Sequence, residues 1–272
     1  MPEGPEIRQE ADRIARALRG KRAEEVWFAF ARLAEHADML RGREVVAVES
    51  RGKALLTRFE GGWNVYAHNQ LYGRWYVVAR GCEPKTNRQL RFAVHTETRS
   101  ALLYSASEIE VLADEELAGH PFLSKLGPDV LSGQVRAATV RKRLRDARFA
   151  GRSLGALLLD QGFVSGLGNY LRSEILFVSG LVPELRPKDL SDGQVAALAD
   201  AILEIARRAY RLKGVTNDPD DNRRLEAEGV PRRERRHYVF ARAGKGCRVC
   251  GVVVVKGESA GRRVYWCPGC QG

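Results

Sequence analysis

The cysteines near the C-terminus constrain the fold of this 272-residue chain more than any other feature. Four of its five cysteines lie in the last 26 residues, as two Cys-x-x-Cys pairs separated by sixteen residues: Cys247, Cys250, Cys267 and Cys270. This spacing is typical of a tetrahedral four-cysteine zinc site. Four protein ligands leave no open position on the metal, so we predict one structural zinc ion on which the folding of this short segment depends. Redox-active or unliganded thiols are the alternatives.

The residues between the two cysteine pairs have the pattern of a β-hairpin. Residues 252–256 and Arg262–Trp266 are the predicted strands, and residues 257–261 are the predicted turn. Arginines on such a hairpin can contact phosphates, although surface arginines are more often only solvated. The fifth cysteine, Cys82, stands alone, which argues against a disulfide framework and favours a reducing compartment.

The N-terminal sequence Met1-Pro2-Glu3-Gly4-Pro5-Glu6 predicts a nucleophile with an acid beside it. Removal of Met1 would give Pro2 a free secondary amine, and an α-amino group titrates at about 7.7–8.0, so part of it is unprotonated near neutrality. Its adduct with a carbonyl carbon is a permanently charged iminium, which favours a subsequent elimination. The alternative is an ordinary helix start, because proline at the first helical position and glutamates in the first turn are both common there.

The charge of the chain favours a polyanionic partner. Lys and Arg number 45 against 34 Asp and Glu, a formal net charge of +11. Such an excess suits nucleic acid or an anionic membrane surface, and charge alone does not distinguish them. No apolar run approaches the roughly 20 residues needed to span a bilayer, and no signal pattern opens the chain. We therefore expect a cytoplasmic protein with no membrane association.

The pattern along the chain predicts an α+β fold with a change of character near residues 131–135. Ile7, Ala11, Ile14 and Leu18 share one helix face, and Gly20 ends that helix. Six short β-rich runs follow, as in a sandwich: 45–48, 54–59, 64–67, 74–78, 90–94 and 101–104. Ser107 with Glu110, and Ser191 with Gln194, match the capping box that opens a helix.

Residues 136–212 are predicted to be mostly helical, with a glycine-rich double turn inside. Helices are expected over 154–161 and 170–177, with Asn169 at the start of the second. The backbone amides exposed by Gly166 and Gly168 at that helix N-terminus would suit a phosphate. The alternative is that Asn169 only caps the helix and the glycines only turn the chain.

Together these features resemble the formamidopyrimidine-DNA glycosylase and endonuclease VIII family, and its endonuclease VIII branch most closely. The likeness runs essentially end to end. Beside the N-terminus and the cysteines, the matching motifs are Trp27-Phe-Ala-Phe30, Arg51-Gly-Lys-Ala-Leu-Leu56, His68-Asn-Gln-Leu-Tyr-Gly73, Leu103-Tyr-Ser-Ala-Ser107, Gly166-Leu-Gly-Asn169 and Tyr265-Trp-Cys-Pro-Gly-Cys270.

The resemblance implies a bifunctional base-excision repair enzyme that removes oxidised pyrimidines and then cuts the strand by β,δ-elimination. It implies three parts: a catalytic helix-plus-sandwich domain over residues 1–131, a helix-two-turn-helix domain over 136–236, and a zinc hairpin over 237–272. The implied partner is double-stranded DNA containing oxidised bases or abasic sites, bound by a monomer.

The resemblance also assigns catalytic roles. Pro2 would attack the sugar C1′ and leave a covalent iminium, while Glu3 would protonate the sugar ring oxygen. Lys53 would contact the phosphate or the damaged nucleotide, although a lysine on a strand is usually a surface residue. Glu6, one helical turn from Glu3, matches the family's supporting carboxylate.

The remaining implied residues bind DNA. Asn169 and Arg262 would hold the phosphates that flank the lesion. Excision needs the target base to leave the stack, and a loop matching Gln70, Leu71 and Tyr72 would fill the gap with an apolar wedge, an aromatic face and an amide. Without the resemblance, Leu71 and Tyr72 would be assigned to a core or a hairpin.

Three other functions are weighed against this one. An oxidised-purine glycosylase would use the same machinery, and the Gln70-Leu71-Tyr72 loop argues against it. The segment 213–236, which has no close likeness to the endonuclease VIII pattern, lies where relatives place base-recognition elements, so it leaves the preferred lesion open. A non-catalytic damaged-DNA-binding protein is disfavoured by the intact Pro2, Glu3 and Lys53. A zinc-ribbon component of transcription or of ribosomes would leave the N-terminus unexplained.

Overall fold

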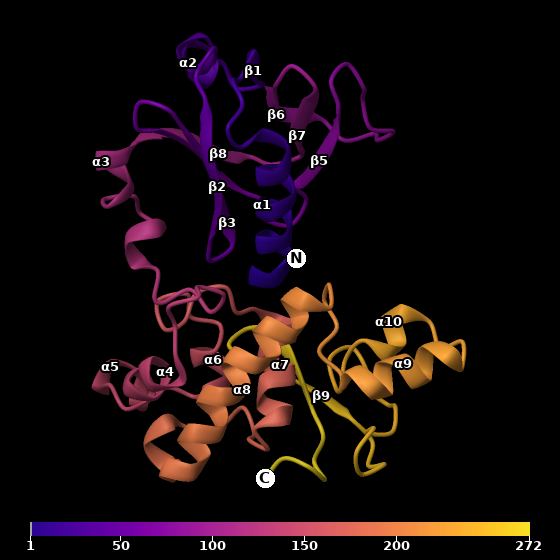
Figure 1. Ribbon diagram of the computed structural model, residues 1–272. Helices are drawn as coiled ribbons and strands as arrows, with labels where there is room; N and C mark the ends of the chain where they lie inside the picture. Colours follow the sequence, from indigo (N-terminus) through magenta and orange to yellow (C-terminus); the bar gives the residue numbers. More distant parts are fainter. Residues whose placement is uncertain (1) are drawn as a thin grey trace. The chain divides into compact units, whose positions relative to one another are not determined.

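The computed structural model describes residues 2–272, so Met1, whose removal would expose the Pro2 amine, lies outside the described residues. The chain forms two units (Figure 1): an N-terminal unit of Pro2 and Glu6–Lys125, and a C-terminal unit of Leu126–Gly272 together with Glu3–Pro5. Helix α1 (Gly4–Leu18) therefore begins with residues of the C-terminal unit and continues in the N-terminal one. The three-part division at residues 131 and 236 stays a prediction.

The N-terminal unit is built on two four-stranded antiparallel sheets. The strands are β1 (Glu25–Phe28), β2 (Val45–Arg51), β3 (Ala54–Phe59), β4 (Trp63–His68), β5 (Arg74–Ala79), β6 (Leu90–His95), β7 (Arg99–Tyr104) and β8 (Glu108–Ala113). One sheet has the order β2-β3-β4-β8 and the other β1-β6-β7-β5. The six β-rich runs of the sequence are β2 to β7, so the predicted sandwich is confirmed.

Helix α1 closes the core of this unit. Ala11, Ile14 and Leu18 are fully buried and belong to one apolar cluster with side chains from both sheets, among them Val45 and Trp75. The helix ends where the apolar spacing predicts, because Gly20 takes a positive φ of 73° that glycine adopts without strain. The short elements η1 (Ala31–Leu33) and α2 (Ala34–Leu40) follow β1.

The capping box predicted at Ser107 is wrong, because Glu108–Ala113 form strand β8. The first four residues of the strand alternate: Ile109 and Val111 belong to the apolar core of the sandwich, while Glu108 and Glu110 lie on the other face. A period of two indicates a strand and not a helix. The match of Ser107 and Glu110 to a helix start was therefore coincidental.

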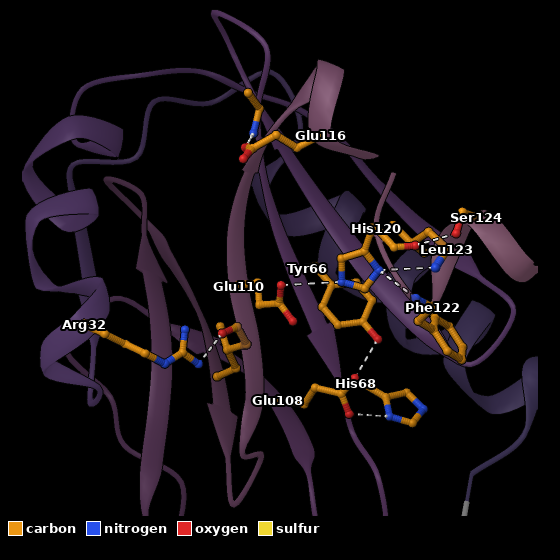
Figure 2. Close-up of polar contacts among 12 residues, drawn as sticks. Arg32, Tyr66, His68, Glu108, Glu110, Glu116, His120, Phe122, Leu123 and Ser124 are labelled. Carbon is orange, nitrogen blue, oxygen red and sulfur yellow. Dashed lines mark hydrogen bonds and ion pairs between the residues drawn. The ribbon is translucent and has the colours of Figure 1, made fainter. Parts of the chain in front are cut away.

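His120 fixes the chain where it crosses the outer face of β4 and β8 (Figure 2). Its Nδ1 accepts hydrogen bonds from the backbone amides of Phe122 and Leu123, each at 3.2 Å. The centroid of its ring lies 4.5 Å from the centroid of the Tyr66 ring. Because Nδ1 is an acceptor, the ring proton is on Nε2, which faces Glu110 at 3.5 Å. This arrangement orders the segment that holds α3 (Asp114–Leu117) and η2 (Leu123–Lys125).

The C-terminal unit is mainly helical. Its helices are α4 (Ala137–Leu144), α5 (Ala147–Ala150), α6 (Leu154–Leu157), α7 (Asn169–Val178), η3 (Pro187–Asp189), α8 (Asp192–Arg211), α9 (Pro219–Ala227) and α10 (Arg232–Arg235). Ser191 and Gln194 form the predicted capping box of α8. The helix predicted over 154–161 is a single turn, α6, and the chain then turns through 158–168 into α7. Among residues 2–272, no helix combines the length and the apolar character that crossing a membrane requires.

Helix α7 lies at the centre of this unit, and a buried carboxylate on it anchors a second segment. The carboxylate oxygens of Glu174, which is fully buried, accept the backbone amides of Tyr238, Val239 and Phe240 at 2.8–2.9 Å and the hydroxyl of Thr216 at 2.6 Å. Burial raises the pKa of Glu174, and these four donors act against that shift. Both ends of the segment 213–236, which contains α9 and α10, are therefore tied to α7.

The cysteine-rich end of the chain is the predicted two-stranded hairpin. Strand β9 (Val255–Ser259) pairs with β10 (Arg262–Trp266), so the second strand matches its prediction and the first starts three residues later than expected. Ala260 and Gly261 make the turn, both with positive φ. The buried part of this segment packs in a small apolar cluster with Phe177 of α7.

Candidate active site and nucleic-acid interface

Glu3 occupies the N-terminus of α7. Its side chain is 4% exposed, and its two carboxylate oxygens accept the backbone amides of Tyr170 (2.8 Å) and Leu171 (3.2 Å). The sequence predicts that these amides bind a phosphate, but in the structure they donate their hydrogen bonds to the Glu3 carboxylate. A carboxylate at a helix N-terminus is stabilised by the unsatisfied amides and by the helix dipole.

Two glycines allow this close approach. A Cβ atom on Gly168 would lie 2.5 Å from Oε1 and 2.7 Å from Cγ of Glu3, closer than atoms pack. Gly4 donates its amide to the carbonyl of Gly166 at 2.8 Å, and a Cβ there would lie 2.9 Å from the Gly166 backbone. The Gly166-Leu-Gly-Asn169 turn is therefore shaped to receive the chain at Glu3 and Gly4.

Arg172, one turn further along α7, joins this turn to the hairpin. Its guanidinium is fully buried and donates to Oδ1 of Asn169 at 2.8 Å. It also donates, at 2.9–3.1 Å, to the backbone carbonyls of Gly155, Ser259, Arg262 and Arg263. Burial, together with the nearby charge of Arg262, lowers the pKa of Arg172 to about 10, which leaves it charged at neutral pH. One cation therefore fixes both Asn169 and the hairpin backbone at Arg262.

Asn169 and Arg262 present polar groups outward from this anchor. Arg172 engages Oδ1 of Asn169, and Nδ2 has no hydrogen bond to another residue in 2–272. The Arg262 side chain is exposed, and its backbone carbonyl accepts a hydrogen bond from Arg172 at 3.1 Å. An amide donor and a guanidinium held in this way are suited to bind an anion.

In the N-terminal unit, the loop of residues 69–73 between β4 and β5 carries unusually exposed apolar side chains. Leu71 is 56% exposed and Tyr72 is 66% exposed, so neither is a core residue. Gln70 has a positive φ of 49°, and Gly73 closes the turn by donating its amide to the carbonyl of Asn69 at 2.7 Å. Exposed large apolar residues at the tip of a tight loop are typical of a contact surface.

The amide of Gln70 is engaged at both ends. Its Oε1 accepts from Ser107 Oγ at 2.8 Å, and its Nε2 donates to Glu108 Oε2 at 3.0 Å. The same carboxylate accepts from Tyr66 Oη at 3.0 Å and lies 3.2 Å from Nδ1 of His68 (Figure 2). These contacts use one of the two Nε2 protons and one of the two Oε1 lone pairs, so the Gln70 amide can still bind a further group.

The other predicted catalytic residues, Pro2, Glu6 and Lys53, belong to the N-terminal unit. Pro2 is half-buried and immediately precedes Glu3 and α1. Glu6 is half-buried in the first turn of α1. Lys53 is half-buried in the turn between β2 and β3, beside Gly52 with its positive φ of 60°.

The four predicted cysteine ligands converge. The sulfur atoms of Cys247, Cys250, Cys267 and Cys270 all lie within 4.8 Å of one another. Two pairs are 3.8 Å and 3.4 Å apart, and a tetrahedral metal with bonds of about 2.3 Å to sulfur separates its ligands by about 3.8 Å. The cluster therefore fits a metal ion held by four thiolates.

Comparison with known proteins identifies the family. Residues 1–107 match the family model of the formamidopyrimidine-DNA glycosylase N-terminal domain, and residues 126–219 match that of the H2TH domain. The chain is 47% identical to Endonuclease 8 of Klebsiella pneumoniae subsp. pneumoniae and 48% identical to Endonuclease 8 of Escherichia coli, over 100% of each chain. This chain belongs to the formamidopyrimidine-DNA glycosylase and endonuclease VIII family. The predicted resemblance is thereby confirmed.

Solved structures of the family share the fold. A complex of Lactococcus lactis Fpg with DNA containing an abasic site matches with a TM-score of 0.80 at 19% identity over 99% of both chains. The complex of the same protein with DNA containing an oxidised pyrimidine matches with a TM-score of 0.80 at 20% identity, also over 99% of both chains. The predicted α+β class, with a sandwich, a helix-two-turn-helix and a four-cysteine hairpin, is confirmed.

The sequence did not predict the structural roles of Arg172, Asn69 and Glu10. Arg172 is three residues after Asn169, so a helical period would have placed the two side chains together. Asn69 was noticed only as part of the motif around Gln70, and its contact with Glu10 of α1 joins residues 59 positions apart. No local pattern predicts such a contact.

We expect Arg172→Lys to weaken binding of the protein to DNA by about tenfold or more, equivalent to about 1.4 kcal/mol. A single ammonium cannot replace the several hydrogen bonds that the planar guanidinium makes to Asn169 and to the hairpin. Arg223→Lys is the matched control, because Arg223 is exposed and pairs only with Asp220 nearby in α9. Fluorescence anisotropy with a labelled duplex measures both affinities. An equal loss of DNA affinity in the two variants would contradict the conclusion that Arg172 holds Asn69 and the hairpin in place for DNA binding.

Proposed function

We propose that this family member is a base-excision repair enzyme that removes oxidised pyrimidines from double-stranded DNA and cleaves the strand at the resulting abasic site. The observation that carries the proposal is the buried carboxylate of Glu3, fixed by two α7 amides and adjacent in sequence to Pro2. The full-length identity of 47–48% to Endonuclease 8 proteins supports the preference for oxidised pyrimidines.

In the proposed reaction, the Pro2 nitrogen is the nucleophile. The Glu3 carboxylate first takes one proton of the Pro2 ammonium. The freed amine attacks C1′ of the damaged nucleotide, the bond from C1′ to the base breaks, and the remaining N–H proton of Pro2 passes to the departing base, which leaves as a neutral molecule. Glu3 then returns the proton to the ring oxygen, the sugar ring opens, and an iminium joins Pro2 to C1′.

Strand cleavage follows from the charge of the iminium. It acidifies the hydrogens on C2′, and loss of one of them expels the 3′ phosphate by β-elimination. A second elimination through the conjugated system expels the 5′ phosphate. We assign Lys53 to the phosphate or the damaged nucleotide and Glu6 to support of the Glu3 carboxylate. Hydrolysis of the remaining iminium releases Pro2 for the next cycle.

We assign the DNA contacts to residues of both units. Asn169 and Arg262, fixed by Arg172, are proposed to bind the phosphates beside the lesion. Gln70, Leu71 and Tyr72 are proposed to fill the gap left by the extruded nucleotide, supported by the exposure of Leu71 and Tyr72. The net charge of +11 favours association with DNA in a salt-dependent manner.

We propose that the metal held by the four cysteines is a structural zinc ion. The four thiolates and their separations support a closed tetrahedral site, which leaves no position for substrate. The zinc ion supplies no step of the reaction. It would keep the hairpin folded, and with it the backbone at Arg262.

Single-turnover excision tests the proposed lesion class. Matched duplexes would carry an oxidised pyrimidine or an oxidised purine, and we expect the pyrimidine to be removed faster by about tenfold or more. Glu3→Gln, which cannot carry the proton, should bind both duplexes and excise neither base. Faster removal of the purine would assign the chain to the purine-specific activity, and binding with no excision by the wild type would indicate a non-catalytic damage-binding protein.

A further inference from the structure

The 69–73 loop is tied to helix α1 at both ends. Before the loop tip, Asn69 donates its Nδ2 amide to Oε2 of Glu10 at 2.7 Å. Just after the loop, the backbone carbonyl of Trp75 accepts from Nη2 of Arg13 at 2.8 Å. Glu10 and Arg13 are one turn apart on α1, the helix that begins two residues after Pro2. The loop and the helix therefore form one connected piece within the N-terminal unit.

The geometry of the turn makes Asn69 the residue that sets the position of the loop tip. Asn69 is 2% exposed. A Cβ on Gly73 would lie 2.6 Å from the Asn69 carbonyl oxygen, so the turn closes with no room for a side chain at its end. A shift of Asn69 must therefore move Leu71 and Tyr72, whose own side chains are mostly exposed.

We propose that Glu10 and Asn69 are positioning residues that hold the 69–73 loop at a fixed place on the nucleophile-bearing helix. The proposal rests on the proposed function of that loop as the gap filler. A loop that enters the DNA stack must keep its distance from the attacking nitrogen, since a misplacement of about 1 Å at a reacting site can cost about 10²-fold in rate. Glu10 and Asn69 touch neither substrate nor reacting atoms, and they act through Leu71 and Tyr72.

The contact between Glu10 and Asn69 also depends on pH. Burial raises the pKa of Glu10 from 4.5 to about 7; the Asn69 hydrogen bond and the charges of Arg13 and Arg74 lower it, and Glu6 raises it. The buried Oδ1 of Asn69 has no hydrogen-bond partner among residues 2–272. A protonated Glu10 can donate its hydroxyl to this oxygen while its other oxygen still accepts from Nδ2.

The sign of the effect follows from the raised pKa of Glu10. Below about pH 4.5 the carboxyl is protonated in the folded and the unfolded chain, and the folded chain buries no charge at Glu10. Between 4.5 and about 7 the folded chain holds the proton more tightly than the unfolded chain, because burial disfavours the charge, so the stability that Glu10 contributes to the fold declines as pH rises. Above about 7 a single charge-assisted hydrogen bond from Asn69 remains.

The test compares two substrates that need the loop to different extents. Excision of an oxidised pyrimidine from a duplex requires the gap to be filled, whereas cleavage of a single-stranded abasic site does not, because no base pair is opened. For Glu10→Ala and Asn69→Ala we expect duplex excision to fall by about 10²-fold and single-strand cleavage to change less than about twofold. Glu10→Gln, which can pair with both polar atoms of Asn69, should rescue duplex excision.

The dependence of the two rates on pH distinguishes a positioning role from a merely structural one. The ratio of duplex to single-strand rates removes the titration of Pro2, which both reactions share. This ratio should change in the wild type as pH passes through about 7, where Glu10 exchanges a neutral pair of hydrogen bonds for one charge-assisted hydrogen bond, and it should stay flat in Glu10→Gln. A ¹³C NMR titration of the Glu10 carboxyl in the wild type needs no variant, and a pKa near 4.5 would overturn the pH dependence.

Two further outcomes separate the inference from the proposed function. Equal loss on both substrates in Asn69→Ala and Glu10→Ala, or no loss on either, would overturn the positioning role of these residues while leaving the enzyme assignment intact. Failure of the wild type to cleave the single-stranded abasic substrate would overturn the proposed function itself.

Discussion

Gly168→Ala is expected to reduce base excision by about 10²- to 10⁴-fold, the usual contribution of a positioned acid or base, while the protein still binds DNA. The added Cβ would lie 2.5 Å from Oε1 of Glu3. Gly168 has an extended backbone, with φ of −145°, so the effect arises from space and not from backbone strain. The Glu3 carboxylate must then leave the amides of Tyr170 and Leu171, and its proton transfer with Pro2 is misaligned.

Gly151→Ala is the matched control for this substitution. No atom lies within 4 Å of the Cβ position at Gly151, which ends the short helix α5 in a right-handed conformation that alanine adopts readily. Single-turnover rates, thermal unfolding and duplex affinity would be measured for both variants. If Gly168→Ala excised the base at the wild-type rate, the hydrogen bonds from the α7 amides to Glu3 would not be needed for catalysis.

Removal of the metal is expected to abolish specific DNA binding. The free energy of binding structural zinc, about 10–16 kcal/mol in isolated fingers, is comparable to the whole stability of a typical domain, about 5–15 kcal/mol. The apolar cluster around the cysteines has few members, among them Phe177, Val254 and Tyr265, and the hairpin adds only Val264 and Trp266 to the larger core, so we expect the hairpin to lose its fold without the metal. Loss of the hairpin releases Arg262 and the carbonyls that Arg172 binds.

Two cysteine substitutions isolate this effect. Cys250→Ser removes one ligand, whereas Cys82→Ser changes an exposed cysteine of the N-terminal unit, remote in sequence from the metal cluster. Metal content by mass spectrometry and duplex affinity by anisotropy should both fall in Cys250→Ser and stay unchanged in Cys82→Ser. Metal-free protein with normal affinity for DNA would contradict the structural role of the ion.

Much of the fold was readable because its signals are local. Short β-rich runs between glycine, asparagine or charged clusters predicted strands β2 to β7, and Ser191 with Gln194 predicted the capping box of α8. Strand β8 was missed because a chance match to a capping box outweighed its own alternation. Helix α9 was missed although Asp218 before Pro219 is a helix-start signal, and the Asp218 side chain indeed accepts the amides of Asp220 and Asp221.

The candidate site divides in the same way. The spacing of the cysteines is local, so their convergence followed from the sequence. The partners of Glu3 are 167 and 168 residues away, and the contact of Arg172 with the hairpin spans about 90 residues. Local patterns of side chains carry no information on such distant contacts. The position of Glu3 at the N-terminus of α7, the contacts of Arg172 and the pairing of Glu10 with Asn69 could therefore be found only in the structure.

Borohydride trapping on an abasic-site duplex tests the central claim most directly. Protein with Met1 removed should yield a covalent DNA adduct, and peptide mass spectrometry should place the reduced bond on the Pro2 nitrogen. Protein that retains Met1, whose Pro2 nitrogen is an amide, should give no adduct at that position. An adduct on a lysine, or tight binding to the duplex with no adduct at all, would contradict the assignment of Pro2 as the nucleophile.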